Sequence, residues 1–150
     1  MLLVIYRHGL RAQEACVLEW SAVDWETSEL HVRRVKGGKS AVHPIRGDEL
    51  RALRKLHRET NGRTFMFITE RGGPMTADAL NRMVKRLGDG SKRFGFPIHV
   101  HMIRHACGFK LANDGHDTRA LQDCLGHKSI SSTVRYTELS ATKFKDFWRD

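Results

Sequence analysis

The spacing of apolar residues along the chain predicts a protein made mostly of short helices. Apolar side chains recur every three or four positions, the period of one helix face, over much of the sequence. Thr76 and Asp117 are residue types that cap helix N-termini, and Gly115 and Gly126 are typical helix ends. The expected helical segments are 1–6, 11–18, 48–59, 76–88, 101–113, 118–125 and 130–136.

A second pattern, strict alternation of apolar and polar residues, predicts a small sheet. It runs through residues 29–35, where the period of two is that of a half-buried strand. A glycine-rich turn at 36–39 reverses the chain, so residues 41–45 should return antiparallel to the first strand. Residues 65–69 are expected to form a third short strand or an extended segment. The predicted fold class is α+β, mainly helical with a small antiparallel three-stranded sheet.

The length and charge of the chain narrow the class of protein. At 150 residues it is large enough for one domain with a real core and too short for two domains of ordinary size. It carries 26 Lys and Arg against 17 Asp and Glu, a net charge of +9, and its pI is about 9.9. A polyanionic partner such as nucleic acid is the first expectation, although a basic surface that is merely solvated explains the charge equally well.

Cysteine usage and the start of the chain both predict a cytoplasmic protein. Cys16, Cys107 and Cys124 are odd in number, lack CxxC spacing and lie in apolar stretches, so buried thiols are expected rather than a disulfide framework. The apolar opening at 1–6 is far shorter than a membrane span or a signal-peptide core. No membrane partner is therefore expected.

A group of histidines and an arginine opens the helix expected at 101–113. At 100° per residue, one face should hold His101, Arg104, His105 and Gly108, and the core side should hold Ile103, Ala106 and Cys107. An imidazole moves protons near neutral pH and a guanidinium holds two phosphate oxygens, so this HxxR pair suits phosphate chemistry. Alone it is a weak signal, because such pairs occur on many surface helices.

A metal site at these histidines is not expected. His99, His101 and His105 are joined by no nearby carboxylate or cysteine, and their offsets prevent all three from converging on one ion unless the loop bends. The sequence predicts neither a metal nor another cofactor.

Further motifs follow one another in a fixed order around this group. They are Gly9-Leu10-Arg11-Ala12-Gln13-Glu14-Ala15, Lys36-Gly37-Gly38-Lys39, His101-Met102-Ile103-Arg104-His105, Leu125-Gly126-His127 and Tyr136. Together they resemble the catalytic domain of the tyrosine recombinases, also called phage-type integrases. The similarity is greatest to the fimbrial phase-variation DNA invertases, and it covers nearly the whole chain. The interval between His127 and Tyr136 also fits the family pattern.

The resemblance implies a metal-free phosphoryl transfer on the tyrosine-recombinase catalytic fold. Tyr136 would attack a DNA phosphate, leaving the protein on the 3′ end and freeing a 5′-hydroxyl. Arg11 and Arg104 would hold the non-bridging oxygens while negative charge develops on them. Glu14 and His105 would support the site by positioning these neighbours.

The remaining catalytic roles fall to basic residues. By the same resemblance, His101 would accept or return the tyrosine proton and His127 would hydrogen-bond the phosphate. Lys36 would protonate the leaving 5′ oxygen, with Lys39 in the same turn as a competing candidate. Taken singly, each of these residues has an ordinary structural explanation. Tyr6, the only other tyrosine, is expected in the core.

The resemblance also implies domain limits and partners. Residues 1–150 would form one catalytic domain that lacks its first helix and any N-terminal DNA-clamping domain. The expected partner is double-stranded DNA with paired, inverted-repeat sites, bound as a homotetramer by a chain that is monomeric or weakly associated without DNA. An apolar stripe of Phe144, Phe147 and Trp148 in the tail would pack on the protein's own core or dock on a neighbouring protomer, with equal weight given to each.

An active recombinase located in the nucleoid is the main expectation, and two alternative functions are left open. One is a catalytically silent DNA-binding remnant or regulator, which the short N-terminus favours. The other is a type IB topoisomerase-like enzyme that nicks and reseals one duplex with a similar set of residues. A steep loss of DNA binding with salt is expected for the recombinase and for the silent binder, because phosphate contacts dominate affinity.

Overall fold

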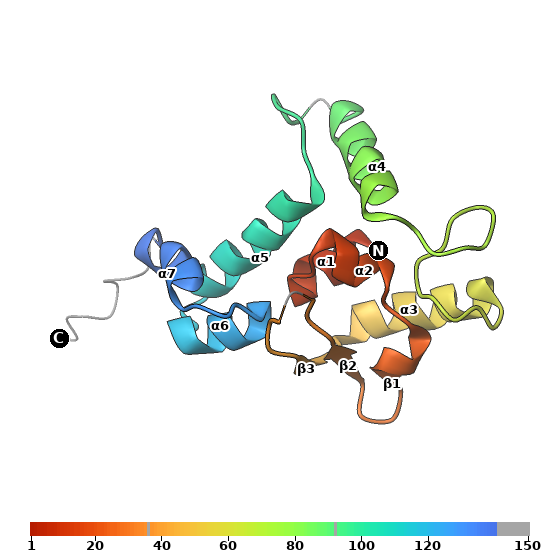
Figure 1. Ribbon diagram of the computed structural model, residues 1–150, viewed down its shortest axis with the longest axis horizontal. Helices are drawn as coiled ribbons and strands as arrows, with labels where there is room; N and C mark the ends of the chain where they lie inside the picture. The colour runs from red at the N-terminus through yellow and green to blue at the C-terminus, as the bar shows by residue number, and fades with distance from the viewer. Residues whose placement is uncertain (36, 92, 141–150) are drawn as a thin grey trace.

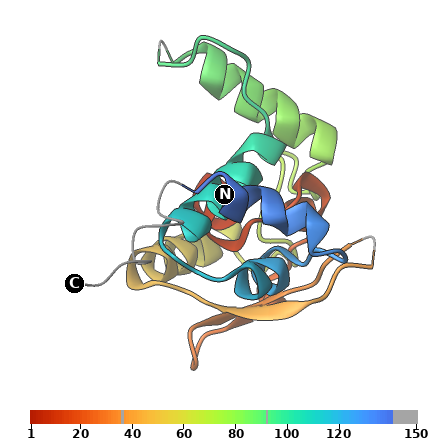
Figure 2. The same cartoon turned by 90° about the vertical axis from the view of Figure 1, so that its left-hand side faces the viewer.

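The computed structural model describes residues 1–35, 37–91 and 93–140 (Figure 1). The small sheet lies along one edge of the molecule with the helices on one side of it (Figures 1 and 2). The chain passes through α1 (Leu2–His8), α2 (Ala12–Cys16), the 3-10 helix η1 (Trp20–Ala22), β1 (Val23–Asp24), β2 (Glu29–Val32), β3 (Ala41–Pro44), α3 (Gly47–Thr60), α4 (Ala77–Asp89), α5 (Val100–Asn113), α6 (Thr118–Leu125) and α7 (Ser131–Glu138). The expected α+β, mainly helical class is confirmed.

The sheet is antiparallel with the strand order β1-β2-β3. Leu30 in the middle strand is opposite His43 of β3 and Val23 of β1, and it is fully buried. The predicted hairpin is thus confirmed, but the third strand is β1 and not residues 65–69. That segment is extended and forms only isolated bridges. The two residues of β1 are too few to show a period, and only their pairing with β2 makes them a strand.

Helix ends lie where the capping residues predicted them. The hydroxyl of Thr76 accepts a hydrogen bond from the Ala79 N–H at 3.1 Å at the start of α4, and the Asp117 carboxylate caps α6. Gly9 and Gly126 end α1 and α6 in the left-handed conformation, with φ of 55° and 63°. These two turns bring the segments that follow α1 and α6 to the same part of the molecule.

The core has two parts. The larger part joins α1 and α2 to the sheet, α3 and α4, and the smaller part lies among α5, α6 and α7. The smaller part contains Cys107, Ala112, Leu121, Leu125 and Tyr136. As predicted, the cysteines are free thiols, and Cys16 and Cys107 are buried.

Helix α5 is oriented differently from the sequence prediction. Ala106, expected in the core, is exposed, while the Arg104 side chain is 1% exposed. Arg104 tolerates burial because it donates hydrogen bonds to the Gly9 and Leu125 carbonyls. Helices α1 and α7 both pack on α5, so the helix is covered on more than one face.

Helix α4 and the described residues that follow it, 90–91 and 93–98, form an arm that projects from the other helices in both views (Figures 1 and 2). Within the described residues, no helix combines the length and apolar character needed to cross a membrane. The predicted tail stripe of Phe144, Phe147 and Trp148 lies outside the described residues.

Candidate active site

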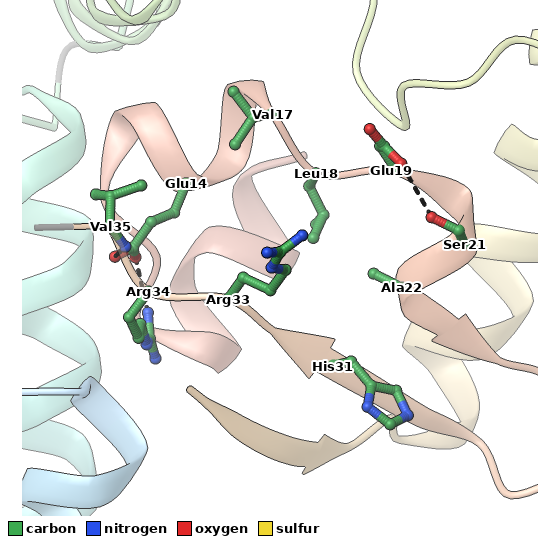
Figure 3. A pocket seen from close by; sticks show the side chains of 10 residues that line it. All are labelled: Glu14, Val17, Leu18, Glu19, Ser21, Ala22, His31, Arg33, Arg34 and Val35. Carbon is green, nitrogen blue, oxygen red and sulfur yellow. Dashed lines mark hydrogen bonds and ion pairs between the residues drawn. The ribbon is translucent and has the colours of Figure 1, made fainter. Parts of the chain in front are cut away.

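The site is built on a buried carboxylate at the start of α2. Arg11 precedes the helix, and its backbone N–H and its guanidinium donate to the Glu14 carboxylate at 2.8 and 2.7 Å. Arg34, which follows β2, donates to the same carboxylate at 2.8 Å (Figure 3). Burial alone would raise the pKa of Glu14, but the hydrogen bonds from Arg11 and the charge of Arg34 outweigh it and lower the pKa. Glu14 is therefore ionised and orients both guanidinium groups.

Arg34 is a residue that the sequence interpretation missed. Its side chain is fully buried and donates to the backbone carbonyls of His8, Gly9 and Cys124 as well as to Glu14. Arg34 lies between β2 and the glycine-rich turn, and its hydrogen bonds link α1 and α2 to the end of α6. The alternation predicted for residues 29–35 could have identified it, because Arg34 has the same phase in that pattern as the buried Leu30 and Val32.

Arg104 on α5 is the second arginine of the interior. It donates to the Gly9 carbonyl and, at 2.8 Å, to the Leu125 carbonyl, and its guanidinium lies 3.9 Å from Glu14. Burial lowers the pKa of Arg104 to about 10, with the charges of Arg11 and Arg34 acting in the same direction. The guanidinium remains charged at neutral pH, so a concentrated positive charge faces the site.

Tyr136 on α7 lies against α5 and is 1% exposed. Its hydroxyl is 2.7 Å from Nδ1 of His105. The ring packs over Gly108, where a Cβ atom would lie only 2.8 Å from it, so glycine is needed for this close approach. Phe109 packs edge to face on the other side. Burial raises the pKa of Tyr136, and Arg104 partly opposes the rise, so the phenol is protonated at neutral pH.

Imidazole rings surround the phenol. His101 is exposed and packs edge to face on His105, with ring centroids 4.3 Å apart. The His127 ring is stacked parallel to the Tyr136 ring at 6.3 Å, and its Nδ1 lies 2.8 Å from the Thr133 hydroxyl. Burial lowers the pKa of His127 to about 4, with help from Arg104, and burial also lowers the pKa values of His101 and His105. All three imidazoles are thus neutral at neutral pH and able to accept protons.

The lysine candidates lie in or near the glycine-rich turn. Lys36 is outside the described residues, and its assignment stays a prediction. The Lys39 side chain is 77% exposed and lies 3.8 Å from Asp123. A cation that the sequence interpretation did not single out, Lys128, lies over this turn, because a Cβ atom on Gly37 would be 2.8 Å from its Nζ. The sequence feature that could have identified Lys128 as a candidate is its position directly after His127.

The structure therefore gathers most of the predicted site residues in one region: Arg11, Glu14, His101, Arg104, His105, His127 and Tyr136. They come from α2, α5, α7 and the segment after α6. One difference concerns the tyrosine proton. The resemblance implied this role for His101, whereas the tyrosine hydroxyl is in contact with His105. A phenol, neutral imidazoles and buried guanidinium groups are the kinds of side chain that phosphoryl transfer requires.

The fold and this site define the class of DNA recombinases that use a tyrosine. Residues 1–143 match the phage integrase family, and the chain belongs to that family. It is 36% identical over 154 residues to the type 1 fimbriae regulatory protein FimE of Escherichia coli (strain K12), covering 99% of this chain and 77% of FimE. It is 29% identical over 159 residues to the tyrosine recombinase XerC of Pediococcus pentosaceus, covering 99% of this chain and 52% of XerC.

Solved structures agree with this assignment. The crystal structure of XerA recombinase superposes with a TM-score of 0.81 at 26% identity over 96% of this chain, which spans 54% of the XerA chain. XerH site-specific recombinase, at 21% identity and a TM-score of 0.81, shows the same fold. The resemblance, the fold class and the tyrosine recombinase enzyme class expected from the sequence are confirmed.

Proposed function

We propose that the chain is a site-specific recombinase that cleaves and rejoins DNA through a covalent 3′-phosphotyrosyl link to Tyr136, with arginines in place of a metal ion. The observation that carries the proposal is the Tyr136 hydroxyl, held 2.7 Å from an imidazole in a region where Arg104 is buried and charged. A phenol next to a proton acceptor and a positive charge suits attack on a phosphodiester.

In the cleavage step, the Tyr136 oxygen bonds to phosphorus and the bond from phosphorus to the 5′ oxygen breaks. The products are a 3′-phosphotyrosine and a free 5′-hydroxyl, and the reverse attack by a 5′-hydroxyl rejoins the strand. Arg11 and Arg104 bind the non-bridging oxygens, whose negative charge grows in the transition state. Because Glu14 fixes Arg11, this binding geometry is set before DNA arrives.

Proton transfer uses the imidazoles and a lysine. The contact with Tyr136 favours His105 as the first acceptor, and the exposed His101 beside it exchanges the proton with solvent. We assign the proton of neutral His127 to Nε2, with the Thr133 hydroxyl donating to Nδ1, so that Nε2 donates to a phosphate oxygen. Lys36 protonates the leaving 5′ oxygen, and Lys39 is the competing donor.

The burial of Tyr136 adds a conformational step. The side chains of Tyr136 and Arg104 are each 1% exposed, so neither reaches a phosphate on a duplex until α7 shifts when DNA binds. This step breaks the packing on Gly108, and the Tyr136 hydroxyl gives its proton to His105 before their hydrogen bond is lost.

The partner in this proposal is double-stranded DNA with paired, inverted-repeat sites. Residues 1–150 act as the catalytic domain, in a homotetramer on DNA and as a monomer or weak oligomer without it. The net charge of +9 supports the choice of DNA as partner. The similarity of the chain to the recombinases XerC and XerA supports it too. A cytoplasmic, nucleoid-associated location follows from this substrate.

A catalytically silent DNA-binding protein is the second candidate. The same burial of Tyr136 favours it, since a nucleophile that stayed packed on α5 would leave a protein that binds DNA without cutting it. This candidate predicts salt-sensitive DNA binding and no covalent product.

The test is covalent trapping on a nicked duplex made from repeats that flank the gene, in buffer with EDTA, followed by a denaturing gel. The wild-type chain should give a protein–DNA band that Tyr136→Phe abolishes. Tyr6→Phe is the matched control and should keep the band, because these are the chain's two tyrosines. A band that survives Tyr136→Phe would refute the proposal. DNA binding without a band on any flanking repeat would favour the silent binder.

A further inference from the structure

The projecting arm ends in an exposed apolar cluster. Leu87 on α4 and Phe94 and Phe96 in the following segment are 53%, 47% and 56% exposed. The two phenylalanine rings touch edge to face, with centroids 6.2 Å apart. Gly95 between them has no neighbouring atoms within van der Waals contact of a Cβ position, so the loop stands clear of the rest of the molecule. Apolar side chains grouped in this way mark a contact surface.

Basic side chains border the cluster. Arg82, Lys85 and Arg86 are exposed on α4, and Arg93 is exposed directly before Phe94. Asp78 pairs with Arg82 and Asp89 is also exposed, so Lys85, Arg86 and Arg93 still leave the arm with a net positive charge. A partner for this surface needs negative charge close to a site that accepts apolar side chains. The phosphate backbone of DNA and its stacked bases provide both.

The cluster is also close to the candidate active site along the chain. Phe96 precedes His101 by five residues, which span at most about 18 Å when extended. One turn of duplex is about 34 Å long. A duplex with a phosphate at His101 and Arg104 therefore passes within reach of the arm.

We propose that Phe94 and Phe96, supported by Leu87, form an apolar wedge that inserts between base pairs of duplex DNA beside the phosphate to be cleaved. The inference rests on the proposed function, because it needs a chain that binds duplex DNA. The basic residues of the arm hold the backbone while the rings enter a flexible pyrimidine–purine step, where unstacking costs least. The wedge bends the duplex and fixes where along it the active site lies.

The test compares binding and bending of one DNA probe by several variants. The probe is a duplex of about two helical turns with a dye at each end, made from a flanking repeat. Fluorescence anisotropy gives the affinity at several salt concentrations, and energy transfer between the dyes gives the bend. The double variant Phe94→Ala/Phe96→Ala should bind at least about tenfold more weakly and bend the probe less. The slope of log affinity against log salt should not change, since no phosphate contact is removed.

Matched variants separate a wedge from other effects. Phe94→Leu/Phe96→Leu keeps an apolar wedge and should retain most of the bend. Arg93→Gln should lower the salt slope by about one, the effect of one lost phosphate contact. Val42→Ala removes an apolar side chain that is 52% exposed on β3 and should change neither quantity.

Three results would overturn the inference. The first is an alanine variant that binds and bends the probe as the wild type does, and the second is a wild-type chain that binds without bending. The third is a variant that loses only self-association, seen by sedimentation, which would assign the cluster to a contact between copies. A wild-type chain that fails to bind any duplex would instead refute the proposed function itself, before the variants are compared.

Discussion

Two clusters of histidines lie on either side of Arg34, and their surroundings differ. In the first, His105 and His127 flank Tyr136, and the exposed His101 opens the cluster to solvent. The second lies where α1, β3 and α3 meet. There, His8 Nε2 is 3.0 Å from the Glu49 carboxylate, and His8 Nδ1 is 3.3 Å from His43 Nδ1. We call these the tyrosine cluster and the glutamate cluster.

The glutamate cluster is buried, and it contains a carboxylate in place of a phenol. His8, His43 and Glu49 are 2%, 6% and 1% exposed, and the nearby Arg7 pairs with Asp48 at 2.7 Å. Burial lowers the pKa of His43 to about 4, much as it does for His127 in the tyrosine cluster. A perturbed histidine is thus no sign of an active site here. A phenol and an opening to solvent distinguish the tyrosine cluster as the candidate active site.

The largest expected effect comes from replacing an arginine in each cluster. Arg104→Lys should slow DNA cleavage by about 100- to 1,000-fold, because lysine cannot hold two phosphate oxygens in the same geometry. Arg7→Lys is the control beside the glutamate cluster and should leave cleavage unchanged. Single-turnover cleavage of the nicked duplex measures both. Equal losses in the two variants would erase the functional distinction between the clusters.

Arg34→Met tests whether one arginine supports both clusters. The substitution removes the hydrogen bonds to Glu14 and to the His8 carbonyl, so the buried Glu14 carboxylate loses one of its partners. The free energy of unfolding should therefore fall by about 3 kcal/mol. Urea denaturation measures the loss. Arg33→Met, at the exposed neighbouring position, should change stability by less than about 0.5 kcal/mol. Similar stability in both variants would show that the buried arginine is dispensable.

Exchanging one histidine from each cluster should separate catalysis from stability. His105→Gln should slow cleavage about 100-fold with little change in the melting temperature, because it removes a proton acceptor. His43→Gln should lower the melting temperature but leave the cleavage rate of the folded fraction unchanged. Calorimetry and single-turnover kinetics on the same samples give the two values. If only His105→Gln lowered the melting temperature, the roles given to the two histidines would be reversed.

The smallest effect is the dependence of stability on pH. An unfolded imidazole binds its proton near pH 6.5, whereas the pKa of His43 in the folded chain is about 4. Between these values the unfolded state binds more protons, so stability falls as the pH falls. His43 should account for a loss of about 2 kcal/mol by pH 5. Urea titrations at pH 7 and pH 5 should show a smaller loss in His43→Gln, and an equal loss would remove His43 as its source.

Local signals in the sequence predicted the helices well. The α6 boundaries follow from Asp117 at one end and Gly126 at the other, because capping is a local interaction. Strand β1 was missed since it exists only through pairing with β2. The candidate site was predicted from motif order, which the fold then gathered in space.

Burial of charged residues was the part that local patterns predicted poorly. Arg34 and Arg104 look like solvated cations in the sequence, yet both are buried because carbonyls from distant segments accept their hydrogen bonds. Arg34 contacts Cys124, 90 positions away. Such partners are visible only when the chain is folded, and the burial of Tyr136 and its contact with His105 belong to the same class of fact.

The most direct test of covalent catalysis by Tyr136 is to identify the residue to which the DNA becomes covalently attached. The trapped covalent complex would be digested with nuclease and protease, and the nucleotide-bearing peptide would be sequenced by mass spectrometry. The expected result is a 3′-phosphonucleotide on Tyr136. A nucleotide on Tyr6, or on a serine, histidine or cysteine, would contradict it.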